Sequence, residues 1–194
     1  MATSVIEICN SALIDLGEEA IASLTDNTKA ARLCNQRWPA VRDAVLRAHP
    51  WNCASALTEL AASATPPDWK WTSSYPLPTD CLRVLSVAMG GTPLSDWEVQ
   101  AGLVLCDETG PLAIAYIRRL DDPRLFDPLL CETLSARLAA TLAYPLTAST
   151  ALGQAFWAIY AEKLREARGV DAREASPIPA PAPTSWLNAK MGGR

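Results

Sequence analysis

Apolar positions recur with helical spacing in four stretches of the chain. Ser4-Val5-Ile6-Glu7 has the spacing of a capping box, and Gly17 suits the left-handed turn that ends a helix. Asp127-Pro128 is a capping residue followed by proline at the first helical position. The last periodic stretch begins near Ser149. These patterns predict helices over about 4–16, 28–49, 127–144 and 149–168.

Two prolines affect where these helices bend or end. Pro39 removes a backbone donor, which predicts a kink or a break near Arg37. Pro145 is expected to end the third helix. The uncharged run Leu138–Ala161 is long enough to cross a hydrocarbon core of about 30 Å. Its hydroxyl, amide and proline residues favour the alternative, two buried bundle helices joined by a turn.

Between the second and third helices the apolar period becomes that of strands. Residues 53–64 fit helix and strand equally poorly, whereas short β-branched runs separated by turns at Gly90-Gly91 and Gly110-Pro111 follow from Leu82. We expect an antiparallel meander over about 82–118, with one face packed on the helices because so small a meander is marginal alone. The predicted fold of residues 1–175 is α+β, mainly α: a bundle of about four helices with this β insertion.

The last segment, 176–194, differs in kind. Proline alternates with small apolar residues from Pro177 to Pro183, which favours an extended arm of about 3.1 Å per residue. The arm ends in Trp186-Leu187 and Lys190, with no acidic residue after Glu174. A tryptophan at the end of such an arm requires a receptive pocket. We favour docking on a partner chain, with folding back onto its own domain as the alternative.

Composition restricts the function. The chain is 49% hydrophobic and 20% charged, typical of a folded protein, and its net charge is −4. It has no dense Lys/Arg cluster, which argues against sequence-specific nucleic-acid binding. The second helix nevertheless has a basic face. That face is either solvated or an inter-subunit contact with an acidic neighbour. Its residues proposed for the contact are Arg32, Arg37, Arg42 and Arg47.

No motif indicates catalysis. The six cysteines are widely spaced and there is one histidine, so we expect core thiols in a reducing cytoplasm and neither a metal nor a cofactor. His49 lies at a predicted helix end, where capping or packing is expected. The adjacent carboxylates Glu18-Glu19 and Asp107-Glu108 lie in predicted turns and lack the separation of a glycosidase pair. We therefore predict that the protein is not an enzyme.

One combination of motifs points to a family. His49-Pro50-Trp51-Asn52 closes the second helix, and Trp69-Lys70-Trp71, Tyr75 and Leu77–Val84 follow at a characteristic spacing. Together with Asp26–Cys34, the C-terminal helices and the Trp186 tail, these resemble the head-to-tail adaptors of short-tailed bacteriophages, also called tail tubular protein A. The resemblance implies a ring, usually dodecameric, beneath the portal protein in the virion neck. The ring would assemble in the bacterial cytoplasm, extend the DNA channel and receive the tail nozzle.

The resemblance also implies roles for residues. Helices would pack subunit against subunit, DNA would only pass through the lumen, and no membrane would be involved. Pro39 departs from the family pattern, and the proline run lengthens the arm. The tail would clamp onto the portal. The implied portal-binding residues are Pro177, Ile178, Pro179, Pro181, Pro183, Trp186, Leu187 and Lys190.

Two other functions remain open from the sequence. The first is a head-completion or tail-terminator ring protein of a long-tailed phage, which acts at a different level of the neck. The second is a virion-associated peptidoglycan hydrolase. Its candidate carboxylates would be Glu18, Glu19, Asp107 and Glu108.

Overall fold

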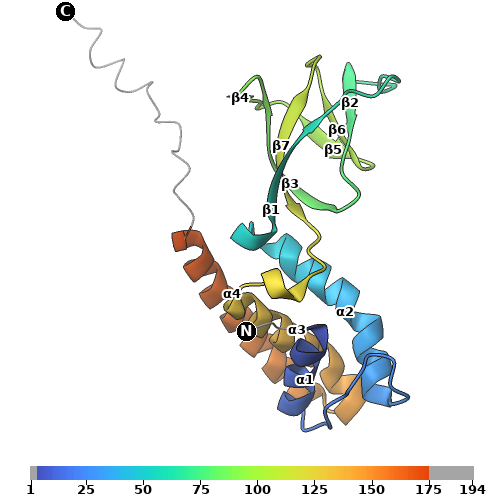
Figure 1. Cartoon of the computed structure of the whole chain (residues 1–194), viewed down its shortest axis with the longest axis vertical. Coiled ribbons are helices and arrows are strands. Elements are labelled where there is room, and N and C mark those ends of the chain that lie inside the picture. Colours follow the sequence, from blue (N-terminus) through green and yellow to red (C-terminus); the bar gives the residue numbers. More distant parts are fainter. Residues whose placement is uncertain (1–3, 175–194) are drawn as a thin grey trace, which may run out of the picture.

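The computed structural model describes residues 4–174, in which a helical body and a β module lie at opposite ends of the molecule (Figure 1). The predicted class, α+β and mainly α, is confirmed. Four helices form the body, and all seven strands described lie between the second and third helices. The helices are α1 (Val5–Asp15), α2 (Lys29–Ala48), α3 (Pro128–Thr147) and α4 (Thr150–Glu174).

Local capping fixes the starts of three helices. The Ser4 hydroxyl accepts a hydrogen bond from the Glu7 N–H while the Glu7 carboxylate accepts one from the Ser4 N–H, so the predicted capping box is confirmed. Thr28 caps α2, and the Asp127 carboxylate accepts from the first free N–H groups of α3. Gly17 has a φ of 78°, which matches the left-handed turn expected there.

The helices differ from the prediction in three places. Helix α2 continues through Pro39, so a break near Arg37 is wrong; Trp38 and Val41 are buried beside the proline and hold the helix against the core. Helix α3 passes Pro145 and ends at Thr147, followed by the C-cap residue Ala148 in a left-handed conformation with a φ of 56°. Helix α4 extends six residues beyond the predicted 168, to Glu174, because its last turns are also packed.

Helix α3 lies at the centre of the helical core. Leu130, Leu134, Leu138 and Leu142 repeat every four residues and are 0% exposed, and α1, α2 and α4 all pack against this helix. The run Leu138–Ala161 forms the end of α3, a turn and the start of α4, as expected. Within residues 4–174, no helix combines the length and the hydropathy that crossing a membrane requires.

The β insertion is larger than predicted, because it begins at Ser55 and not at residue 82. Residues 53–64, which fit neither period, supply the edge strand β1, and β2 was not predicted at all. Leu57 on β1 is an exposed apolar residue, so this strand lacks the regular alternation of apolar and polar residues that identifies a strand in a sequence. The strands are β1 (Ser55–Leu60), β2 (Ser73–Pro76), β3 (Cys81–Met89), β4 (Thr92–Pro93), β5 (Glu98–Gln100), β6 (Leu103–Cys106) and β7 (Leu112–Arg118).

These strands form two antiparallel sheets, in the orders β1-β7-β3-β4 and β2-β6-β5. A separate core fills the module and includes Tyr75, Val104 and Ile114, whereas only its base, near Ile117 and Leu82, joins the helical core. The expectation that a sheet face packs on the helices is therefore wrong. The second sheet, built partly from the unpredicted β2, covers the inner face instead.

Candidate assembly surfaces

The His49-Pro50-Trp51-Asn52 segment forms the joint between the helical body and the β module. His49 is the C-cap residue of α2 and its ring meets Trp51 edge to face, with the ring centres 4.8 Å apart. Trp51 is completely buried, and its indole N–H donates to the Val45 carbonyl over 3.0 Å. Asn52 begins the short 3-10 turn Asn52–Ala54 that leads into β1. The motif is thus a packed structural joint.

Asp171, near the end of α4, completes this joint. It is 7% exposed; one carboxylate oxygen lies 3.0 Å from His49 Nε2, and the other accepts from the Asn52 N–H over 3.1 Å. The Asn52 side-chain amide donates to the Asp171 carbonyl over 2.7 Å. These bonds fix the C-terminal end of α4 to the start of the β module. We call His49, Trp51, Asn52 and Asp171 the joint network.

Sequence reasoning missed Asp171. The residue follows Gly169, where the polar end of the helix was expected, and the charged residues before it suggested a solvated segment. Its position still carried a signal, because it continues the buried stripe of α4. That stripe comprises Phe156, Tyr160, Ala167 and Asp171.

The joint network makes stability depend on pH. Burial lowers the pKa of His49 below its ordinary value, and Arg168 and Arg83 act in the same direction, although Asp171 opposes them. The unfolded chain therefore takes up the proton first, and stability falls as the pH drops below about 6.5 towards the folded-state pKa. Urea unfolding should show a larger loss between about pH 7.5 and 5.5 for the wild type than for His49→Gln. Equal losses would contradict this assignment.

The four arginines expected at an inter-subunit contact do not share one environment. Arg42 pairs with Asp43 and Asp121, and Arg47 donates to the Leu82 carbonyl. These two arginines therefore link α2 to β3 and to the segment that follows β7. Arg32 is exposed and donates to Asn27 Oδ1 over 3.0 Å. Arg37 is exposed. The free basic surface of α2 is therefore smaller than the sequence suggests.

The residues expected to bind the portal, from Pro177 to Lys190, lie outside the described part of the chain. The carboxylates of the hydrolase alternative are far apart in the fold. Glu18 and Glu19 follow α1 in the helical body, whereas Asp107 and Glu108 follow β6 in the β module. Asp107 accepts a hydrogen bond from the Thr72 N–H over 3.0 Å. Within residues 4–174, no group of three or more His, Cys, Asp or Glu side chains is arranged to hold a metal ion.

Two surfaces have the character of contact sites. The first is the Trp69 loop, residues 61–72 between β1 and β2, at the end of the β module away from the helices (Figure 1). Trp69 is 80% exposed there, whereas Trp71, two residues on, is buried. Among residues 4–174, Trp69 is the most exposed of the large aromatic side chains, which makes it a candidate for a contact.

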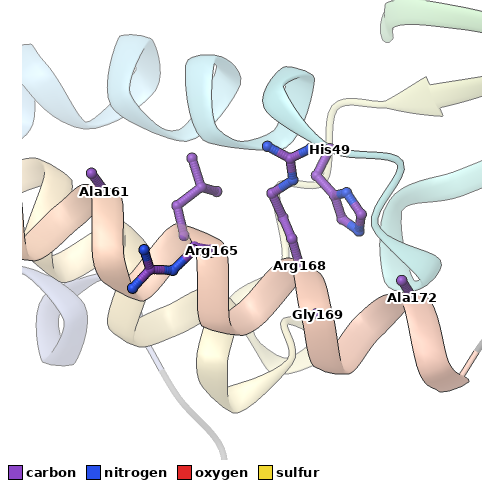
Figure 2. A pocket seen from close by; sticks show the side chains of 7 residues that line it. His49, Ala161, Arg165, Arg168, Gly169 and Ala172 are labelled. Carbon is purple, nitrogen blue, oxygen red and sulfur yellow. The ribbon is translucent and has the colours of Figure 1, made fainter.

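The second surface is a groove of about 470 Å³ beside α4, here called the α4 groove. Figure 2 shows Ala161 and Ala172 along one side of α4, with Arg168 extending beside His49. Small and apolar groups make up most of the lining, and the two arginines supply its charge. Its lining residues are His49, Ala161, Leu164, Arg165, Arg168, Gly169 and Ala172.

A scan against protein-family models and a search of curated proteins each gave no match for this chain.

Proposed function

We propose that this chain is the subunit of a head-to-tail adaptor ring in a short-tailed bacteriophage. In this role it joins the capsid vertex to the tail, lies beneath the portal protein and extends the DNA channel, with twelve copies in the ring. It functions in the neck of the virion after assembly in the bacterial cytoplasm. It acts as a structural protein and not as an enzyme.

The observation that supports this proposal most is the position of the motif that carries the resemblance. His49, Trp51 and Asn52 are not scattered over the surface but form the joint where α2, α4 and β1 meet. A ring subunit needs fixed geometry between the parts that contact its neighbours, since small rotations accumulate around a closed ring. The joint network supplies such a fixed connection.

The same network defines where the proposed arm begins. Asp171 holds the end of α4, and the helix ends at Glu174, just before the proline-rich segment 176–194. A tether that starts from a fixed point keeps its tryptophan at a high effective concentration near a neighbouring chain. The arm, with Trp186 as its anchor, is accordingly proposed to bind the portal, and the opposite side of the ring receives the tail nozzle.

Deletion of residues 176–194 tests the proposal. We expect the truncated protein to stay folded, because residues 4–174 contain both a helical core and a β core, and to lose binding to the portal protein of the same virus. Circular dichroism would report the fold, and biolayer interferometry with purified portal would report binding. Ala substitution at Trp186 should weaken binding by at least about 30-fold, as for a central interface tryptophan.

The matched control is Trp157→Ala, which alters a tryptophan outside the arm. Trp157 is 42% exposed on α4, and we expect portal binding to be unchanged by its substitution. Unchanged portal affinity of the truncated protein would refute the proposed role of the arm. Failure of the full chain to bind the portal at all would refute the proposed function.

A further inference from the structure

Trp69 is presented by a strained turn. The Trp71 N–H donates to the Trp69 carbonyl over 2.9 Å, and Lys70 between them has a φ of 71°. This is the positive-φ form of the γ-turn, which is rare and strained for a residue other than glycine. Such a conformation is unfavourable and persists only when its surroundings determine it.

The surroundings of Lys70 do determine it. Its ammonium group pairs with Glu98 over 3.0 Å and lies 4.4 Å from the centre of the Trp71 ring. The Trp71 indole N–H reaches the same Glu98 carboxylate, and the Thr72 N–H is held by Asp107. Four interactions thus hold the turn, and Trp69 is exposed to solvent. An aromatic side chain carried on a held stretch of backbone loses less entropy on binding than one on a flexible loop, which suits an interface anchor.

The charged residues around Trp69 indicate which kind of partner surface the Trp69 loop can bind. Lys70 is the one basic residue in the Trp69 loop, the strands β5 and β6 and their turns. An acidic rim of this kind disfavours anionic lipid and nucleic acid and favours an apolar pocket with a basic border. The acidic residues of the same segments are Asp68, Asp96, Glu98, Asp107 and Glu108.

The α4 groove of this chain has those properties. Ala161, Leu164 and Ala172 form an apolar lining, and Arg165 and Arg168 place positive charge at its border. Arg165 is exposed, and its nearest acidic partner, Glu162, is 4.0 Å away at the surface. The groove volume, about 470 Å³, falls in the range of sites that accept a bulky side chain.

We propose that the Trp69 loop of one copy of this chain docks into the α4 groove of a second copy. The loop lies at the far end of the β module from the helices, so it does not reach the groove of its own chain (Figure 1). The C-terminal arm is a poorer occupant, because it carries Lys190 and Arg194 and no acidic residue. Arginines at the groove would repel it.

The contact is head to tail, since it joins two different surfaces. Contacts of this type generate closed rings when the rotation between copies closes and filaments when it does not. The inference thus rests on the proposed ring and names the surfaces that build it. Glu98 and Lys70 are positioning residues here, because they act through the conformation of the turn.

Sedimentation velocity of the full-length chain tests the contact. At low salt the wild type should self-associate in a concentration-dependent manner, and added salt should weaken the association because opposite charges meet. Trp69→Ala and Arg165→Glu should each weaken it by at least about 30-fold. Ile14→Ala, which changes an exposed apolar side chain outside both surfaces, is the matched control and should leave association unchanged.

Mixing the two defective variants gives the sharpest result. Trp69→Ala retains an intact α4 groove and Arg165→Glu retains an intact Trp69 loop, so their mixture should form a dimer that does not grow, although each alone stays monomeric. A mixture that remains monomeric, association that survives Trp69→Ala, or a monomeric wild type at the highest soluble concentration would overturn the contact. Association without portal binding would instead refute the proposed function and leave the contact standing. Loss of association after deletion of 176–194 would identify the arm as the occupant and also overturn it.

Discussion

Replacing Trp51 by alanine should lower the free energy of unfolding by about 3–5 kcal/mol, the range for removing a fully buried tryptophan. The side chain is 0% exposed and belongs to the helical core. Its removal would leave a cavity at the joint, strand the Val45 carbonyl without its indole donor and deprive His49 of its ring partner. Because a domain of this kind has a total stability of about 5–15 kcal/mol, the variant would be close to unfolding at physiological temperature.

Equilibrium unfolding in urea, followed by far-ultraviolet circular dichroism, would measure the loss. Trp69→Ala provides the matched control, because it removes the same side chain from a position that is 80% exposed. Its free energy of unfolding should stay within about 0.5 kcal/mol of the wild type. Similar losses in both variants would show that burial of Trp51 does not determine the stability of the joint.

The sequence predicted the helices well, for physical reasons that are visible in the chain. Caps such as Ser4 and Asp127 act over three residues, so they can be recognised without knowledge of the tertiary fold. The leucine repeat of α3 faces the core on all its turns, and its period is therefore regular. These helices are determined by interactions between residues close together in the chain, and such interactions can be recognised from the sequence.

The β module was predicted poorly because its strands depend on distant partners. Strand β1 pairs with β7, more than fifty residues away, and its Leu57 faces solvent, so neither its neighbours nor its own pattern identified it. Strand β2 is four residues long and all but its last residue are buried, which leaves no alternation to detect. The second sheet, β2-β6-β5, was therefore not expected, because β2 was missed.

The two candidate contact surfaces also depend on features that the sequence does not show. Trp69 belongs to a motif that the sequence displays, but nothing in the sequence shows that Lys70 adopts a positive φ and turns the indole outward. The α4 groove brings His49 together with residues more than a hundred positions later, and no local pattern predicts that proximity. Even Pro39 misled, because packing of its neighbours outweighs the cost of the lost backbone donor.

Replacing Asp171 by alanine should lower the free energy of unfolding by about 2–4 kcal/mol, since hydrogen bonds to a charged group contribute more than neutral ones and their buried partners would be left unsatisfied. The variant removes the acceptor of the Asn52 N–H and the partner of His49. The hydrogen bond from the Asn52 side-chain amide to the Asp171 backbone carbonyl would remain. We therefore expect the end of α4 to loosen before the whole protein unfolds.

Hydrogen exchange of the full-length chain distinguishes this local opening from general destabilisation. In Asp171→Ala, amides in the last two turns of α4 and at Asn52 should exchange faster, while those around Leu134 at the centre of α3 should follow only the global change. Asp171→Asn, which keeps an acceptor for Asn52 but lacks the charge, should fall between this variant and the wild type. Glu174→Ala, which alters an exposed carboxylate one turn further along, should behave as wild type. If Asp171→Ala changed only the global exchange, the joint network would not be the attachment of α4, and the fixed origin proposed for the arm would lose its physical basis.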